Sequence, residues 1–335
     1  NTAVGYNALT ANSTASYNTA IGDQALLDNT TGAENVAVGH AALFENTTAS
    51  YNTAVGTSAL RNNTASDNTA VGHNSLNQNT SGANNTAVGC NALLANTSGT
   101  NNVVIGFDAA KTATEMKNTV AIGSGALETH TDAWVYETDT VAIGYKAAAL
   151  NTTGYMSVYI GSNAGGSSTT GGANVSIGYD AGRLATTAAH NTSIGYYSGR
   201  GVTGGQQTSL GHSANSGTQT GANNTVVGYA AAPSSTSVSN EITLGNASVT
   251  KFRIPGLNFS IKDSTATDNY VLTVDANGDA GWEAASSGVT SEEIQKMKDD
   301  SEKKAIQKRF ERMYKANTNE ELLELIKDDL DDLED

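Results

Sequence analysis

A glycine that recurs at a nearly constant interval is the feature of this 335-residue chain that most limits how it can fold. Each copy ends a short phrase such as Asn-Thr-Ala-Val-Gly. Eleven of the fourteen intervals between successive copies are 17 residues long, two are 16 and one is 21. A fixed short period is the signature of a repeat architecture, in which one small unit stacks on the next. Seven further copies, ending at Gly245, follow the first eight anchor glycines, which are Gly5, Gly22, Gly39, Gly56, Gly72, Gly89, Gly106 and Gly123.

Seventeen residues suffice for one short β-coil but not for a helix together with strands. The phrase before the glycine, Thr2–Val4 in the first repeat, is rich in β-branched residues and alternates in side-chain size, which favours a strand. A second phrase, Asn7–Leu9, predicts another short strand. Gly and Asn-Thr pairs are typical of corners, where a positive φ or a side-chain hydrogen bond is needed. The sequence therefore predicts an all-β, parallel β-solenoid of fifteen 17-residue coils over residues 1–250.

The composition limits how stable a single column of such coils can be. Aromatic residues make up 6% of the chain, and each coil offers about one Val or Ile, one Leu and a few Ala. Ordering the backbone costs roughly 1–2 kcal/mol per residue, whereas a fully buried Val or Leu contributes only about 1.5–3 kcal/mol. We therefore expect three chains to pack together on their Val, Ile and Ala faces, as a homotrimer.

Charge and motifs argue against several classes of function. The net charge of −15 disfavours binding to nucleic acid, and no apolar run approaches the ~20 residues of a membrane-spanning helix. No phosphate-binding loop, nucleophile elbow or dinucleotide fingerprint is present. We therefore expect no enzyme activity, no cofactor and no membrane insertion. His40 and His73 follow anchor glycines and could bind a metal if stacked, but we interpret them as surface corner residues; Cys90 is interpreted as a small residue of the repeat.

The 21-residue interval is the one irregularity with a possible function. Loops inserted in a repeat project outward, and exposed aromatic residues often contact ligands. We therefore predict that residues 128–138 form a lateral loop that contacts a glycan or a protein. The alternative is a tolerated insertion whose Trp packs against the column. The candidate contact residues are His130, Asp132, Trp134 and Tyr136.

Two further modules are expected after the repeats. In residues 251–287 the pair Asn277-Gly278 separates two strand-like runs, which predicts a β-hairpin, and Trp282 would help it cap the solenoid. In residues 288–335 two capping boxes, starting at Thr290 and Thr318, predict a helical hairpin. The apolar residues expected to pack between helices are Ile294, Met297, Ile306, Phe310, Met313, Leu322, Ile326 and Leu330.

The runs at 18–22 and 118–123 resemble the head repeats of trimeric autotransporter adhesins, and closely similar repeats occur in bacteriophage tail-fibre-like proteins. The resemblance covers about residues 1–250 and implies a trimeric, left-handed parallel β-roll. The chain departs from the adhesins because acidic helices stand where those proteins have a coiled-coil stalk and a membrane-inserting β-anchor. The run from Val271 to Trp282 is similar to a cap module near the C-terminal ends of phage fibres. These differences favour the phage branch.

The resemblance implies a structural fibre at the surface of a bacteriophage virion, on its tail or head, that attaches to a host-surface glycan or protein. The expected partners are two further copies of the chain and another virion protein. That protein would be bound through the C-terminal helices or through a segment before Asn1, which lies within a repeat. The first alternative is a trimeric adhesin at a bacterial cell surface. The second is an ice- or surface-binding solenoid, which is weakened because a regular Thr-x-Thr face is missing.

Overall fold

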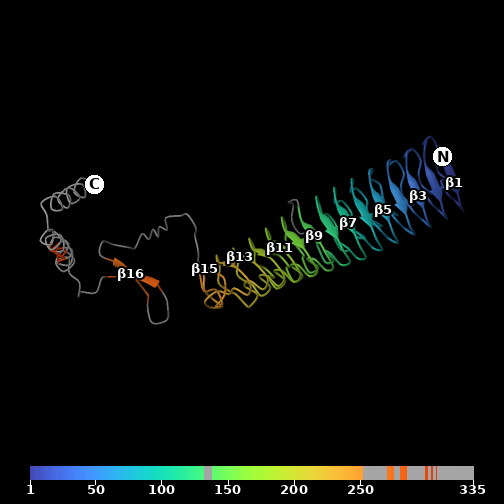
Figure 1. Ribbon diagram of the computed structural model, residues 1–335. Helices are drawn as coiled ribbons and strands as arrows, with labels where there is room; N and C mark the ends of the chain where they lie inside the picture. Colours follow the sequence, from blue (N-terminus) through green and yellow to red (C-terminus); the bar gives the residue numbers. More distant parts are fainter. Residues whose placement is uncertain are drawn as a thin grey trace, which may run out of the picture. The chain divides into compact units, whose positions relative to one another are not determined.

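A computed structural model describes residues 1–131 and 138–251, the strands at 270–274 and 280–284, and residues 299, 300, 303, 304 and 307. The chain divides into two compact units, Asn1–Phe252 and Arg253–Asp335, and each is considered by itself. The first unit is a parallel β-solenoid, as the repeat predicts (Figure 1). Its coils follow the 17-residue spacing of the anchor glycines.

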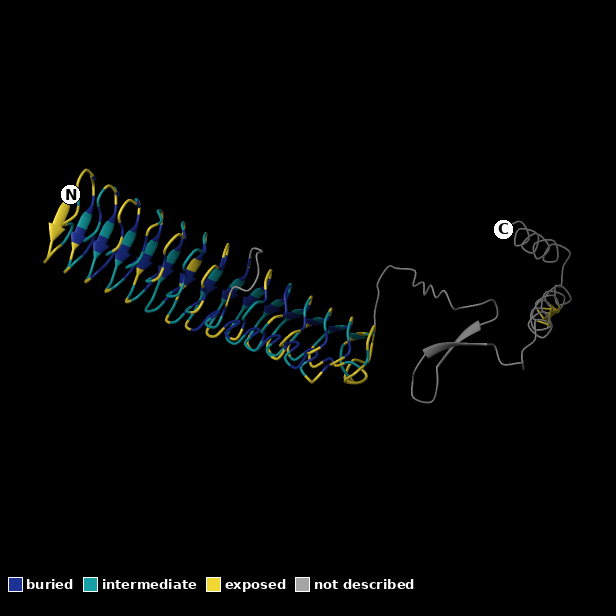
Figure 2. Ribbon diagram, turned by 180° about the vertical axis from the view of Figure 1, so that it is seen from behind, coloured by how far each residue is buried: buried dark blue, intermediate teal, exposed yellow. Residues whose placement is uncertain are grey.

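One sheet runs along the whole solenoid. Fifteen strands of three residues pair in parallel and in chain order, so that Ala3 lies beside Ala20 and every residue lies beside its equivalent in the next coil. β1 is exposed along its whole length (Figure 2). The strands are β1 (Thr2–Val4), β2 (Thr19–Ile21), β3 (Val36–Val38), β4 (Thr53–Val55), β5 (Thr69–Val71), β6 (Thr86–Val88), β7 (Val103–Ile105), β8 (Val120–Ile122), β9 (Val141–Ile143), β10 (Val158–Ile160), β11 (Val175–Ile177), β12 (Thr192–Ile194), β13 (Thr208–Leu210), β14 (Thr225–Val227) and β15 (Ile242–Leu244).

The second predicted strand of each coil is wrong, because this segment forms turns. In the first coil Asn7 and Leu9 both have left-handed backbones, with φ of 54° and 56°. The segment still bonds from coil to coil, since the Leu9 N–H donates to the Ala25 carbonyl at 2.9 Å. Alternating positive and negative φ angles bend the chain tightly, whereas a strand keeps all its φ angles negative. A sequence of only three residues, such as Asn7–Leu9, does not show whether the backbone forms a strand or a turn.

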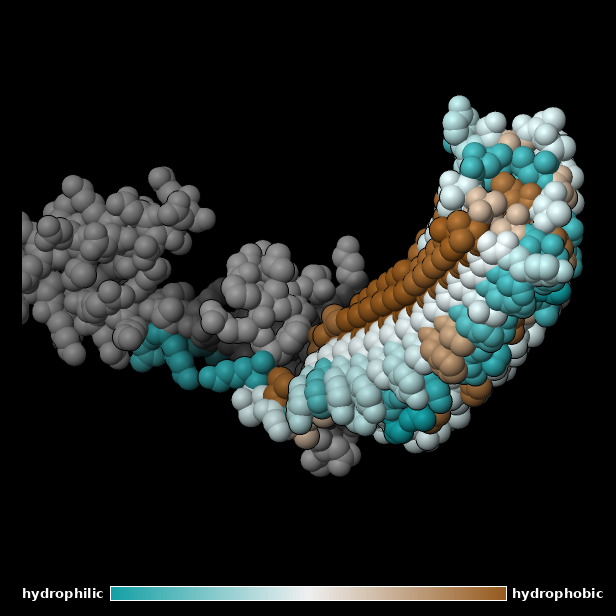
Figure 3. Space-filling view, turned by 90° about the vertical axis from the view of Figure 1, so that its right-hand side faces the viewer, coloured by the Kyte–Doolittle hydropathy of each residue, from teal (hydrophilic) through white to brown (hydrophobic). Residues whose placement is uncertain are grey.

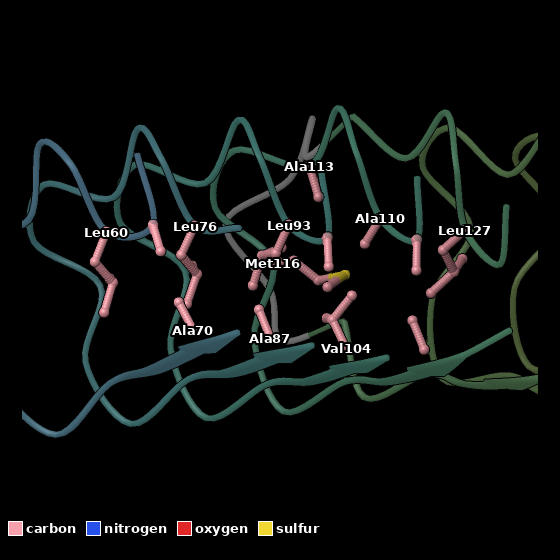
Figure 4. Packing of buried hydrophobic residues seen from close by; sticks show 14 of the residues in the cluster. Leu60, Ala70, Leu76, Ala87, Leu93, Val104, Ala110, Ala113, Met116 and Leu127 are labelled. Carbon is pink, nitrogen blue, oxygen red and sulfur yellow. The ribbon is translucent and has the colours of Figure 1, made fainter. Parts of the chain in front are cut away.

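The core is a single layer of side chains from each side of the coil. The middle residue of each strand points inward, as Ala70 and Ala87 do, and meets Leu residues of the turn segment, such as Leu60 and Leu76 (Figure 4). These side chains are fully buried. A core this thin is filled mostly by Ala and Leu, which explains how the chain folds with so few aromatic residues.

At β10 the large side chain of the core comes from the strand and the small one from the turn segment, the reverse of the usual arrangement. Tyr159 occupies the middle strand position and is 1% exposed, and its hydroxyl lies 3.2 Å from the Ser168 Oγ. The turn segment opposite carries Gly165 in place of Leu, and a Cβ there would lie 2.1 Å from the Tyr159 ring. In the next two coils Ser176 and Ser193 face glycines instead. The core is therefore bulky at β10 and small and polar in the two coils after it.

The anchor glycines close the corner after each strand. Gly72 has a φ of 136°, and a Cβ built on it would lie 2.4 Å from the carbonyl oxygen of Gly89 in the next coil. At all eight predicted anchors from Gly5 to Gly123, the distance from such a Cβ to the carbonyl oxygen of the next anchor glycine is 2.3–2.5 Å. Both the dihedral angle and the stacking distance therefore require glycine.

Buried asparagines close the opposite end of the coil. Asn46 donates through Nδ2 to the Asn29 Oδ1 at 2.9 Å and to the Ala49 carbonyl at 3.0 Å. In a second column the Asn35 backbone N–H donates to the Asn18 Oδ1 at 2.9 Å. These side chains satisfy buried backbone groups that the sharp corners leave unpaired. The predicted role of Asn at the corners is thus confirmed.

In the second unit, β16 (Tyr270–Val274) and β17 (Ala280–Ala284) pair antiparallel, with Leu272 opposite Trp282. The Asn277-Gly278 turn lies outside the described residues, and the role of this unit as a cap stays a prediction. Residues 299, 300, 303, 304 and 307 are helical. All eight apolar residues predicted to pack between C-terminal helices lie outside the described part. The helical hairpin, the left-handed sense and the homotrimer also remain predictions.

Candidate functional site

The predicted contact loop is described only in part. Asp132, Trp134 and Tyr136 lie outside the described residues. His130 is 2% exposed, and its Nδ1 lies 3.1 Å from the Asn151 Oδ1, so it occupies a place in the buried asparagine column. A buried imidazole cannot contact a ligand at the surface. His130 is therefore withdrawn as a contact residue, and the contact hypothesis now concerns the other three side chains.

An apolar stripe runs along the outer face of the sheet. It consists of the third residue of each strand, which points away from the core. Val4 is 58% exposed and Leu244 is 53% exposed, and between them Ile21 and Ile105 remain accessible. Figure 3 shows a continuous hydrophobic row on the solenoid. The predicted Val, Ile and Ala packing face is corrected in one respect, because the strand alanines point into the core and only the larger residues lie on the outer face.

The residue directly after each anchor glycine forms a column at the corner. Tyr179, Tyr196, His212 and Tyr229 stack there with ring centroids 5.3, 5.0 and 5.3 Å apart. The spacing follows from the coil rise of about 4.8 Å, which is close to the stacking distance of aromatic rings. A hydrogen bond with Tyr197, and then burial, raise the pKa of Tyr196. We call these four residues the aromatic stack.

A basic cluster lies on the turn segments of the two coils after β11 and β12. The side chain of Asp180 is 2% exposed, and its Oδ2 accepts from Arg183 Nη1 at 3.1 Å and from Arg200 Nε at 3.3 Å. The Arg200 guanidinium lies over the Tyr197 ring, with its central carbon 5.2 Å from the ring centroid. A buried carboxylate thus fixes two cations beside an aromatic ring.

Sequence reasoning missed this cluster, although a signal was available. Arg183 and Arg200 both stand five residues after an anchor glycine, and each follows a Gly that lets the turn segment pass close to the core. Asp180 stands two residues after its anchor, on the same outer face. Equivalent repeat positions stack along the solenoid, so comparing positions two and five across neighbouring coils would have predicted that these three residues lie close together.

A surface hollow of about 220 Å³ adjoins the basic cluster. It spans the turn segments of the coils after β8, β9, β10 and β11. Positively charged, negatively charged and hydroxyl or amide side chains all reach it. The hollow is lined by Glu128, Lys146, Ala149, Leu150, Asn163, Gly166, Ser167 and Arg183.

His40, His73 and Cys90 each lie near a side chain of a neighbouring coil. The His40 Nε2 lies 3.8 Å from the Asp23 carboxylate, and the His73 Nδ1 lies 3.8 Å from the Cys90 Sγ. Within the described ranges, no three His, Cys, Asp or Glu side chains gather in a way that could hold a metal ion. The same part of the chain contains no helix with the length and apolar character needed to span a bilayer.

Comparison with known proteins gives no match: no family model, no curated protein and no solved structure is significantly similar to this chain. The resemblance to the head repeats of trimeric adhesins and phage fibres therefore depends on the repeat motifs themselves. A parallel solenoid is compatible with that resemblance but does not identify the family.

Proposed function

We propose that this chain is a structural fibre protein of a bacteriophage virion, on the tail or the head, which works as a homotrimer and attaches the virion to its host. The rod-like first unit supports a fibre role. Between the first and the last of its fifteen strands the sheet extends over fourteen steps of about 4.8 Å, or roughly 70 Å. The phage assignment depends on the resemblance of the repeats.

The single observation that carries the trimer is the apolar stripe. It extends along the sheet from Val4 to Leu244, and its exposed members would lose unfavourable contact with water on association. A second copy presents the same stripe with the same rise per coil. Identical columns therefore match over their whole length, which a partner of unrelated structure would not do. The stripe supports association of identical chains, and the proposal of three copies depends on the resemblance of the repeats to trimeric adhesin heads.

Two charged substitutions on the stripe test this packing. Val71 and Ile105 are each 37% exposed, so Val71→Asp with Ile105→Asp leaves the core intact while placing two carboxylates on the stripe of each copy. We expect the wild-type chain to have a trimeric mass in analytical ultracentrifugation and the double variant to dissociate. Gln78→Asp, at an exposed position of a turn segment, is the matched control and should stay trimeric. A monomeric wild-type chain would contradict the trimer.

The C-terminal region has two proposed roles. Residues 288–335 would form either a clamp that holds three chains in register or a docking module for another virion protein. Deleting residues 290–335 separates them by two measurements, the mass of the purified chain and its incorporation into particles. Loss of the trimer supports the clamp, whereas a stable trimer that no longer assembles onto particles supports docking.

The alternative function is a trimeric adhesin at a bacterial cell surface, since the same rod and stripe would serve it. Antibody labelling of purified virions and of intact cells discriminates between the two. Label on virions supports the fibre, and label on uninfected cells that carry the gene supports the adhesin.

A further inference from the structure

We infer that the surface hollow and the basic cluster beside it bind an acidic oligosaccharide that carries a carboxylate or a phosphate group. The inference deepens the proposed attachment function and takes its biological meaning from it, because it names the class of ligand that would be bound. It concerns the turn segments of the coils after β8 to β12 and does not involve the loop at 128–138 beyond Glu128.

Charge is the first argument. The hollow and the basic cluster carry three cations, Lys146, Arg183 and Arg200, against two carboxylates, Glu128 and Asp180, so the site has a net charge of +1 in a chain whose net charge is −15. All three cations stand two or five residues after an anchor glycine, which places them on the turn segments. A local positive region on an acidic protein draws anionic ligands to that place and repels them elsewhere.

The two guanidinium groups are the second argument. Arg183 and Arg200 share one oxygen of Asp180, so the cluster keeps one positive charge in excess. Their side chains are 39% and 40% exposed, and each bond to Asp180 occupies one nitrogen of a group with five N–H donors. A guanidinium fixed in this way is suited to paired hydrogen bonds with a carboxylate or a phosphate. The buried Asp180 supplies the orientation that an isolated surface arginine lacks.

The shape of the hollow is the third argument. Five residues after the anchor glycine, the coils after β9 and β10 carry only Ala149 and Gly166, whereas the flanking coils carry Glu128 and Arg183. The two small residues open a hollow between an acid and a base, three coil steps or about 14 Å apart. Such a span accommodates a short oligosaccharide lying along the solenoid.

Several side chains that can form hydrogen bonds with a hydroxyl-rich ligand line the hollow, beside apolar ones. Asn163 and Ser167 can donate and accept hydrogen bonds, Glu128 can accept them from hydroxyl groups, and Lys146 supplies a further cation. The Tyr197 ring lies beside the arginines, with its centroid 5.2 Å from the Arg200 guanidinium carbon, and adds apolar surface for sugar C–H groups. A purely apolar ligand would leave these polar groups without partners.

The face of the solenoid that is formed by the turn segments stays exposed in the proposed trimer. The strands and the turn segments lie on opposite sides of the core, as Leu76 and Ala70 show by pointing toward each other across it (Figure 4). The apolar stripe is on the outer side of the strands. Three copies that pack on their stripes therefore leave the turn segments, and the hollow on them, facing solvent.

Calorimetric titration of the 335-residue chain tests the inference with three probes, namely sialyllactose, a phosphorylated hexose and neutral lactose. We expect at least one anionic probe to bind about tenfold or more tightly than lactose, and its affinity to fall as salt is added. Binding of sialyllactose alone identifies a carboxylate ligand, and binding of the phosphorylated hexose alone identifies a phosphate ligand. Equal affinity for lactose and for both anionic probes, or no binding of either anionic probe, would overturn the inference.

Two variants locate the site. Ser167→Phe fills the hollow without changing charge, and Arg183→Lys keeps the charge but removes the fork of donors; each should weaken anionic binding about tenfold. Arg61→Ala is the matched control, because Arg61 occupies the same repeat position in a coil far from the hollow, stacked 5.1 Å from the Phe44 ring. Circular dichroism checks that each variant is folded. If the Ser167→Phe variant does not fold, the test depends on the Arg183→Lys variant. Unchanged binding in a folded Arg183→Lys chain contradicts the inference.

Adsorption to host cells separates this site from the proposed function. If the chain adsorbs and the folded Ser167→Phe variant adsorbs equally well, the attachment function stands and the saccharide site is wrong. If the chain binds an anionic probe through Arg183 but neither adsorbs to cells nor labels virions, the site stands and the proposed function is wrong.

Discussion

At the scale of the residue, the fold depends on corners that admit very few side chains. Each anchor glycine combines a positive φ with an approach of its Cα to the carbonyl of the next coil. The two asparagine columns serve the other corners by bonding to backbone groups and to each other. The regular spacing of Gly and Asn is thus a direct consequence of sharp turns repeated about every 17 residues.

Gly89→Ala should destabilise the solenoid. The new Cβ would lie 2.4 Å from the Gly106 carbonyl oxygen at a φ of 137°, so both strain and overlap oppose it. A strained φ alone costs about 1–3 kcal/mol. The free energy of unfolding from urea denaturation measures the loss. Gly217→Ala is the control, because nothing lies within 4 Å of its Cβ position. An equal effect of the two substitutions would show that the corner is not the cause.

Glu241 makes the last coil sensitive to pH. Hydrogen bonds from Ser234 and then from Thr243 hold the pKa of Glu241 below its ordinary value of 4.5. Because the pKa is lower in the folded state, the stabilisation is complete above the ordinary value and is lost as the pH falls through the folded-state pKa.

Hydrogen exchange read out by mass spectrometry should therefore show the coil between β14 and β15 losing protection below the ordinary glutamate range, while coils near β5 stay protected. Glu241→Gln should abolish most of this pH dependence, since the amide does not titrate. A coil that opens at the same pH in both proteins would contradict the role of Glu241.

At the scale of the element, strand and turn segment are matched in size across the core. The usual pair is a strand Ala with a turn-segment Leu, and the pair at β10 is Tyr159 with Gly165. These two pairs are similar in total size, so the larger strand residue at β10 is matched by a smaller one in the turn segment. In the next two coils Ser176 and Ser193 face glycines, and the basic cluster lies on the turn segments of these coils.

Tyr159→Ala should create a cavity between β10 and its turn segment. Replacing a large buried aromatic residue by Ala costs about 3–5 kcal/mol, whereas Tyr159→Phe should cost only about 0.5–1.5 kcal/mol because it removes one hydrogen bond, to Ser168. Urea denaturation of both variants measures the difference. Similar losses in the two would indicate that the hydroxyl, and not the ring, stabilises this coil.

At the scale of the whole molecule, the solenoid is an array in which each coil contacts only its neighbours. Stability in such an array is a sum of coil and interface terms, so its length can change without changing the fold. The equivalent residues of neighbouring coils pair directly, as Thr86 and Val103 do between β6 and β7.

Deleting residues 73–89, one complete coil, should therefore leave a folded solenoid, because Gly72 then precedes the next coil in register. Deleting residues 73–80 should unfold that region, since it removes the turn segment opposite the strand. Far-ultraviolet circular dichroism and thermal melting distinguish the two outcomes. A full-coil deletion that abolishes the β signal would contradict the array description.

The period of the anchor glycines determined much of this protein by itself. It predicted the parallel sheet, the strand before each anchor glycine and the glycine corners, because a 17-residue repeat stacks each residue on its equivalent; the second strand that it predicted in each coil is a turn segment. It could not predict which side of a strand faces the core, since side chains alternate and either set satisfies the same pattern. The Leu of the turn segment decides this, because it leaves room only for Ala opposite and turns the Val or Ile outward.

Only the tertiary structure decided the candidate sites. It buried His130 in the asparagine column, although the sequence placed it at the edge of an inserted loop. It also brought Arg200 onto Asp180, twenty residues earlier in the chain, because the two lie on the same outer face of consecutive coils. Repetition fixes which residues stack, but the size of the side chain at each position decides where the stack leaves a hollow.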